Sequence, residues 1–180
     1  MDQRQTLIKE VAAAIARLQA APVLRVGIDG VDGAGKSVFG DELAAALAAC
    51  GRRVIRASVD GFHNPRALRY RQGRHSPQGY FEDSYNYAQL RAALLDPLSP
   101  GGSGCYRTAA FDHRSDAPVE VPQAQAAPGD LLVLDGIFLH RPELRGYWDF
   151  SIFLDVDFAV SVPRFATRDA GPTALDAPMN

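Results

Sequence analysis

The stretch Gly-Val-Asp-Gly-Ala-Gly-Lys-Ser, residues 30–37, decides the fold of this chain. It contains a glycine, four further residues and then Gly-Lys-Ser, which is the P-loop pattern. A flexible glycine turn is the alternative interpretation. The flanks favour a P-loop, because a strand-like β-branched run precedes the motif at 23–28 and an alanine- and leucine-rich segment with helical spacing follows at 38–49. Strand, glycine loop and helix in this order predict a site for a nucleoside triphosphate.

Each residue type of the motif has a physical reason. Glycines allow positive φ and a close approach to phosphate, so that successive N–H groups and the helix N-terminus point at the anion. Lys36 supplies a point charge for the β- and γ-phosphates, and the hydroxyl of Ser37 suits a Mg²⁺ ligand. The residues expected to hold the nucleotide are Gly30, Asp32, Gly33, Ala34, Gly35, Lys36, Ser37 and Val38.

Composition limits the class of protein. The 180 residues are 47% hydrophobic, enough for one globular domain with a core. A net charge of -2 argues against a nucleic-acid partner, since such proteins usually carry a basic face. No apolar run reaches the length of a membrane span, and Asp2 stands where a signal peptide requires positive charge. We therefore expect a cytoplasmic protein without a nucleic-acid or membrane partner; the sequence leaves its oligomeric state open.

We expect a single domain over residues 1–169, with a substrate-binding insert at 61–121 and a disordered tail at 170–180. An amphipathic helix is expected at 5–20, ended by Pro22. A second strand at 53–59 delivers Asp60 to the edge of the sheet where ligands of open α/β folds gather. Asp60 is therefore a candidate for chemistry, the alternative being an Asx turn with Gly61.

A nearly continuous apolar run at 130–134 predicts a buried parallel strand that ends in Asp135 and Gly136. One acid after an apolar strand is a weak signal by itself. Beside a P-loop it has the Walker B arrangement, in which the carboxylate holds Mg²⁺ directly or through water. Ser37 and Asp135 are thus the expected metal ligands, and 150–156 repeats the strand pattern.

The region 61–85 mixes arginines with aromatic residues. Such a mixture can grip a polar or phosphorylated small molecule, although a solvated basic loop is the alternative. We expect a short helix at 86–95, then a strand at 105–111 that returns through Val119 and Val121 as a hairpin. The hairpin carries His113, a candidate substrate contact.

The last recognisable element is a helix at 161–169, with Pro163 in its first turn. Arg164 and Arg168 are four residues apart and so share one helical face. They are either part of a solvated face or a lid that places guanidinium groups on a transferred phosphoryl group.

Five segments in this order resemble the uridine kinase-like P-loop kinases, a group that includes uridine kinase, phosphoribulokinase and pantothenate kinase. They are Gly-Ile-Asp-Gly-Val-Asp-Gly-Ala-Gly-Lys-Ser at 27–37, Val-Asp-Gly-Phe-His at 59–63, Ser-Pro-Gln-Gly-Tyr with Asp-Ser-Tyr-Asn-Tyr within 76–87, Tyr-Arg-Thr-Ala-Ala-Phe-Asp at 106–112, and Leu-Asp-Gly-Ile-Phe-Leu at 134–139. The resemblance runs from about residue 23 to 169 and is far more specific than the P-loop alone.

The resemblance implies a P-loop NTPase-type, doubly wound parallel sheet with helices on both faces and a small substrate-binding hairpin and lid. It also implies ATP with Mg²⁺, and phosphorylation of a hydroxyl on a small, nucleoside-like metabolite. Asp60 matches the acid that accepts the hydroxyl proton, and Arg164 and Arg168 match lid arginines. The expected substrate contacts are Asp60, Phe62, His63, Arg71, Tyr80, Tyr85, Arg107, His113 and Arg114.

The sequence departs from this family in two places. The residues around His113 and Arg114 differ from the uridine kinase pattern, and family members usually continue beyond the lid into a further helix and strand. Two alternatives to a kinase therefore stay open. One is a nucleotide-binding protein without turnover. The other is a regulatory GTPase, which the lack of an Asn-Lys-x-Asp segment disfavours, since the lysines are Lys9 and Lys36.

Overall fold

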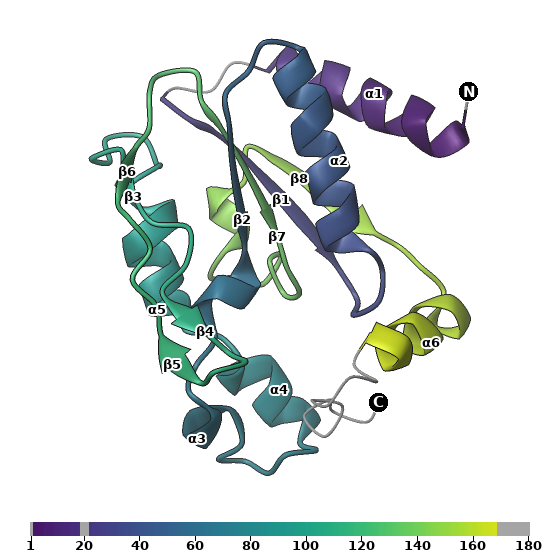
Figure 1. The fold of residues 1–180 in the computed structure, drawn as a ribbon, viewed down its shortest axis with the longest axis vertical. Coiled ribbons are helices and arrows are strands. Elements are labelled where there is room, and N and C mark those ends of the chain that lie inside the picture. Colours follow the sequence, from purple (N-terminus) through teal and green to yellow (C-terminus); the bar gives the residue numbers. More distant parts are fainter. Residues whose placement is uncertain (1, 19–21, 169–180) are drawn as a thin grey trace.

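The computed structural model describes residues 2–18 and 22–168, and the tail expected at 170–180 lies outside them. Its centre is a four-stranded parallel sheet in the order β2-β7-β1-β8 (Figure 1). The strands are β1 (Leu24–Gly30), β2 (Val54–Ser58), β7 (Leu131–Asp135) and β8 (Phe150–Leu154). The expected α/β fold with helices on both faces is confirmed.

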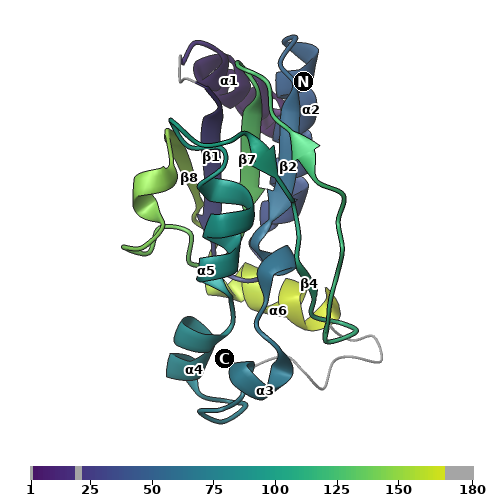
Figure 2. The ribbon, with the colours of Figure 1, turned by 90° about the vertical axis from the view of Figure 1, so that its left-hand side faces the viewer.

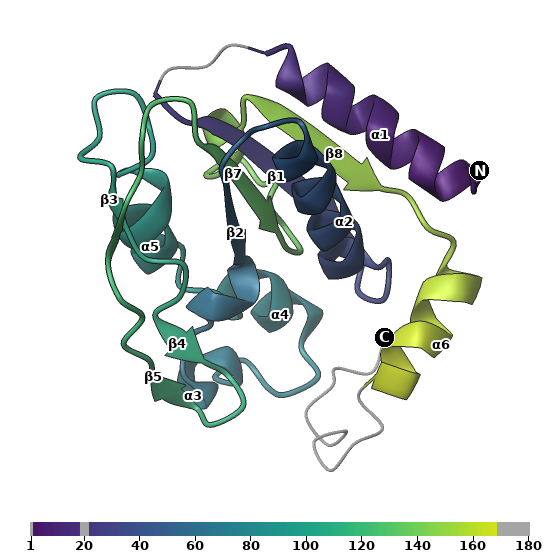
Figure 3. The same cartoon turned by 45° about the horizontal axis from the view of Figure 1, so that its top comes forward.

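One face of the sheet is covered by α1 (Gln3–Ala16) and α2 (Lys36–Ala49), which lie side by side in Figure 3. The first helix ends at Ala16 rather than near Pro22, because the backbone N–H of Arg17 and of Leu18 turns back to the carbonyls of Ala14 and Ile15. Side chains at helical spacing fill the interface with the sheet. This core comprises Ile8, Ala12, Ile15, Leu24, Val26, Ile28, Phe39, Leu43, Leu47, Leu131 and Val133.

The other face is covered by α5 (Tyr87–Leu90) and η2, a stretch of π-helix at Arg91–Leu95 that continues it. Asn86 begins this expected helix, since its side chain accepts a hydrogen bond from the N–H of Gln89 at 3.0 Å. The second core includes Ile55, Phe62, Leu90, Leu94, Leu95, Leu132 and Leu134. Alternate residues of β7 thus enter opposite cores, as expected of a strand buried on both faces.

The segment after β2 folds over the carboxyl ends of the strands. It contains the 3₁₀ turn η1 (Val59–Phe62) and two short helices, α3 (Arg66–Arg69) and α4 (Pro77–Asp83). Figure 2 shows α3, α4 and α6 gathered at the same end of the molecule. This end therefore carries the loops in which an α/β fold places its ligands.

The hairpin expected over 105–121 forms only near its tip, where the N–H of Val119 also donates to the carbonyl of Ala110. Two separate two-residue ladders form instead: β3 (Cys105–Tyr106) with β6 (Ala124–Gln125), and β4 (Phe111–Asp112) with β5 (Ala117–Pro118). The strand breaks between them because the N–H of Arg107 bonds to the carbonyl of Ala93, and that of Ala110 to the carbonyl of Gly61. Contacts distant in sequence thus replace the local ladder at 105–110, whereas it persists between β4 and β5.

The C-terminal helix also differs from expectation. The helix α6 (Phe158–Arg168) begins before 161, because Asp157 precedes it and accepts a hydrogen bond from the N–H of Ala159 at 2.8 Å. Pro163 therefore lies inside the helix rather than in its first turn. A 3₁₀ turn, η3 (Arg145–Tyr147), precedes β8. No helix among the described residues is long and apolar enough to cross a membrane.

Candidate active site

Three strands deliver their carboxyl ends to one place. In the sheet register Asp135 of β7 lies beside Ile28 of β1 and Ser58 of β2, so the P-loop, Asp60 and Asp135 converge. They line a common pocket, into which α6 also projects. The described lining residues are Asp32, Gly33, Gly35, Lys36, Ser37, Val38, Asp60, Tyr85, Asp135, Gly136, Ile137 and Phe165.

The P-loop has the backbone geometry of a phosphate cradle. Gly33 and Gly35 have φ of 74° and 86°, in the left-handed region that favours glycine. Gly35 precedes the first turn of α2 and has no side chain to occupy the free N–H groups there. Nζ of Lys36 donates to the carbonyls of Gly30 and Val31, each at 2.8 Å. Burial lowers the pKa of Lys36, and the carboxylates of Asp32, Asp60, Asp135 and Asp29 oppose that shift.

Ser37 and Asp135, the two residues expected to bind a metal, contact each other. Oγ of Ser37 donates to Oδ2 of Asp135 at 2.8 Å, and Asp135 is only 2% exposed. Oδ1 of Asp135 is buried without a hydrogen-bond partner among the described residues. A hydroxyl and a buried carboxylate at this spacing suit Mg²⁺, which takes few protein ligands and completes its shell with phosphate oxygens and water. The described residues contain no cluster of three acidic, histidine or cysteine side chains able to hold a metal.

Asp60 is held in place by two neighbours. The hydroxyl of Tyr85 donates to Oδ1 of Asp60 at 3.2 Å, and burial raises the pKa of Tyr85 so that the phenol stays protonated. Nδ1 of His63 lies 2.9 Å from the backbone carbonyl of Asp60, which can only accept, so Nδ1 carries the proton. The rings of Tyr85 and His113 lie 4.5 and 4.6 Å from the ring of His63. Burial lowers the pKa of His63 to about 4, so the imidazole is neutral at pH 7.

The expected substrate contacts separate into two groups. Tyr85 lines the pocket with Asp60, while the rings of His63 and His113 follow it in a series of tilted contacts. The other expected contacts have different surroundings. Phe62 is a core residue, Tyr80 donates to Asp32 of the P-loop, Arg71 pairs with Asp83 at 2.6 Å, and Arg107 and Arg114 are exposed.

The helix α6, which is the expected lid, lies beside the P-loop in Figure 3. A Cβ atom at Gly33 would lie 2.1 Å from the carbonyl oxygen of Ser161, so only glycine permits this approach. Phe165 enters the pocket, whereas Arg164 is exposed and lies outside the described lining. Arg168 belongs to α6, but its side chain is not among those described. The role of both arginines stays a prediction.

Two residues of this site escape the motif analysis. Asp29 is 5% exposed and accepts hydrogen bonds from the N–H groups of Gly30, Phe138 and His140, which ties the P-loop to the segment after β7. Phe138 has a φ of 66°, an uncommon value for a non-glycine residue. The second residue is Arg56, which lies 2.7 Å from Asp135. The signal for both is a charged residue inside a strand of the central sheet.

Solved structures of other proteins share this fold. A search of curated protein sequences found no match. Among solved structures, the chain is similar to a "possible uridine kinase" from Bacillus stearothermophilus, with 21% identity, a TM-score of 0.76, and coverage of 96% of this chain and 95% of that one. It is also similar to a "putative fructose transport system kinase" from Silicibacter sp. TM1040, with 23% identity, a TM-score of 0.70, and coverage of 100% and 85%. These likenesses show the fold.

The family is shown by sequence. The model of the phosphoribulokinase / uridine kinase family matches residues 25–172, which include all of the central sheet except Leu24 and every described residue that lines the pocket. The chain therefore belongs to the phosphoribulokinase / uridine kinase family of P-loop kinases.

Proposed function

We propose that this protein transfers the γ-phosphoryl group of ATP, with Mg²⁺, to a hydroxyl group of a small, nucleoside-like metabolite. One observation carries the proposal. A single pocket joins the phosphate-binding loop, the Ser37–Asp135 pair and the carboxylate of Asp60. These are the groups that phosphoryl transfer requires: an anion cradle, a metal-binding pair and a base.

The division of work follows from where each group lies. The N–H groups of residues 33–37 and Nζ of Lys36 would hold the phosphates. Mg²⁺ bound by Ser37 and Asp135 would supply positive charge to the phosphate oxygens. The acceptor oxygen bonds to the γ-phosphorus, the bond from that phosphorus to the bridging oxygen breaks, the acceptor proton passes to Asp60, and ADP leaves. Positioning and charge neutralisation supply most of the rate in such a transfer.

The rings beside Asp60 support a nucleoside-like acceptor. Tyr85, His63 and His113 form a series of tilted ring contacts that starts at the carboxylate, and a flat base can pack against such rings. One similar structure is described as a possible uridine kinase, which agrees with this choice. Arg164 and Arg168 complete the proposal as lid arginines that approach the transferred phosphoryl group when both substrates are bound.

The test is an ADP-release assay with ATP and Mg²⁺ against nucleosides, vitamin precursors, sugars and sugar phosphates, with GTP as a second donor. We expect turnover on a nucleoside or a close analogue. Asp60→Asn should keep nucleotide binding while turnover falls about 10²- to 10⁴-fold, because the base is lost. Lys36→Ala should lose both nucleotide binding and turnover.

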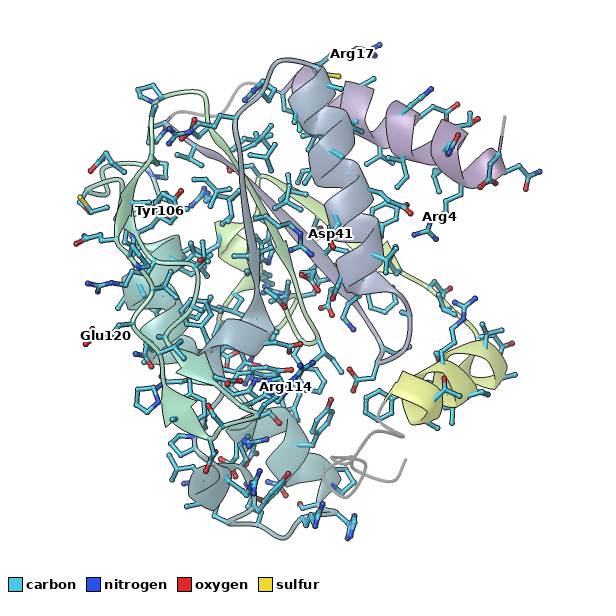
Figure 4. All side chains as sticks on the ribbon, viewed as in Figure 1. Arg4, Arg17, Asp41, Tyr106, Arg114 and Glu120 are labelled. Atoms are coloured by element: carbon cyan, nitrogen blue, oxygen red, sulfur yellow. The ribbon has the colours of Figure 1, made fainter. Side chains whose placement is uncertain are left out.

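Glu120→Gln is the control, because Glu120 is an exposed acid far from the pocket (Figure 4). Normal turnover in Asp60→Asn would remove Asp60 from the mechanism. Binding of ATP without turnover on any acceptor would instead favour a nucleotide-binding protein that does not catalyse.

A further inference from the structure

Arg56 of β2 connects three elements at the back of the pocket. Nη1 lies 2.7 Å from Oδ1 of Asp135 on β7, Nε donates to Oδ1 of Asp41 on α2 at 2.8 Å, and Nη2 donates to the carbonyl of Ser37 at 3.2 Å. Figure 4 shows Asp41 on the side of α2 nearest β2. The side chain of Arg56 is 24% exposed. One guanidinium therefore touches both members of the expected metal-binding pair.

The two oxygens of Asp135 have different neighbours. Oδ2 accepts from the hydroxyl of Ser37, while Oδ1 faces Arg56, whose Nη1 hydrogens are directed at the carbonyls of Ala57 and Val133. A carboxylate is planar, so a cation held against one oxygen restricts the direction of the other. We infer that Arg56 is a positioning residue that keeps Oδ2 of Asp135 and Oγ of Ser37 aligned for Mg²⁺. This inference rests on the proposed function.

The helix opposite Arg56 leaves room for it. Gly40 lies inside α2, where glycine is unfavourable. A Cβ atom at this position would lie 2.7 Å from Nη2 and 2.9 Å from Cζ of Arg56. Gly40→Ala would therefore displace the guanidinium while it keeps every charge and improves the helix propensity. This variant therefore tests the position of the Arg56 guanidinium while the charge of Arg56 and the helix propensity of α2 are maintained.

Arg56 is itself a cation, so its repulsion of Mg²⁺ opposes the gain in Mg²⁺ affinity that aligned ligands provide. Arg56 lies between Asp135 and Asp41, so the three side chains together carry one negative charge. The cluster therefore still attracts Mg²⁺, and the alignment of the ligands decides the sign of the effect. Outer residues that orient metal ligands typically change metal affinity by about 10- to 100-fold.

The experiment measures how much Mg²⁺ improves the binding of a non-hydrolysable ATP analogue, by calorimetry with Mg²⁺ and with EDTA. Arg56→Met should reduce this improvement by about 10- to 100-fold and leave binding in EDTA unchanged. In Arg56→Lys the improvement by Mg²⁺ should lie between those of the wild type and Arg56→Met, because an ammonium group cannot contact all three partners. Gly40→Ala should resemble Arg56→Met.

Arg53→Met is the matched control. Arg53 pairs with Asp130 at 2.6 Å, so this variant removes an arginine–aspartate pair at the opposite ends of the same two strands. It should keep the full effect of Mg²⁺. If Mg²⁺ improves nucleotide binding as much in Arg56→Met and in Gly40→Ala as in the wild type, the inference about Arg56 is overturned, but the proposed function is not. A wild-type protein whose nucleotide binding ignores Mg²⁺ would contradict both the inference and the proposed function. If Arg56→Met does not fold, Gly40→Ala decides.

Discussion

His63 contacts the backbone of the candidate base Asp60 and the ring of His113. Its environment makes the stability of the fold depend on pH. It packs between the rings of Tyr85 and His113, and the nearby charged or titratable groups are Asp60, His113 and Arg69. Burial dominates and lowers the pKa of His63 from 6.5 to about 4. The folded protein therefore keeps this imidazole neutral at pH values where the unfolded chain protonates it.

The consequence is a loss of stability in acid. Above pH 6.5 neither state binds the proton, and the stabilisation is complete. As the pH falls from 6.5 towards 4, only the unfolded chain binds it, so the free energy of unfolding falls by about 1 kcal/mol for each pH unit. Urea unfolding at pH 7 and pH 5 measures this slope. His63→Gln should reduce it, whereas His75→Gln, at an exposed position, should keep it. Equal slopes in all three proteins would contradict the assignment.

At the scale of elements, α4 is attached to the P-loop through one side chain. The hydroxyl of Tyr80 donates to Oδ2 of Asp32, and burial, followed by the charge of Asp32, raises the pKa of this phenol. Tyr80→Phe should lower the free energy of unfolding by about 1–2 kcal/mol, because a hydrogen bond to a charged group is lost. Hydrogen exchange in Pro77–Asp83 should become faster.

Tyr147→Phe is the matched control, since Tyr147 donates to Asp96 in a more exposed pair between other elements. It should cost less than about 1 kcal/mol and leave exchange in α4 unchanged. Unchanged exchange in the Tyr80→Phe protein would show that α4 is held by its other contacts.

The same scale explains what the sequence could predict. The strand, P-loop and helix were readable because their signals are local: glycines at the positions of positive φ, and apolar residues at the correct spacing. The hairpin expected over 105–121 forms only near its tip, because the N–H groups of Arg107 and Ala110 bond to the carbonyls of Ala93 and Gly61, which are remote in sequence. Arg56 was missed because its role depends on Asp135, which is remote in sequence.

At the scale of the whole molecule, the strands that end at the pocket pack against both hydrophobic cores, one on each face of the sheet. The β7 strand sends Val133 into the core under α1 and α2, and Leu134 into the core under α5, before it ends at Asp135. The P-loop follows β1, which pairs with β7 along its length. A ligand that fixes the P-loop and Asp135 therefore stabilises elements from both halves of the structure, and we expect its effect on global unfolding.

The last prediction follows from that coupling. ATP with Mg²⁺ at about 100 times its dissociation constant should raise the free energy of unfolding by about 3 kcal/mol, and the melting temperature by about 5–10 °C. Lys36→Ala should abolish most of this shift, because Nζ of Lys36 is the cation of the phosphate cradle. Lys9→Ala removes the other lysine of the chain, exposed on α1, and should keep the full shift. Differential scanning calorimetry measures all three proteins. A full shift in Lys36→Ala would show that Lys36 does not contribute to nucleotide binding, because its ammonium group is absent from that protein.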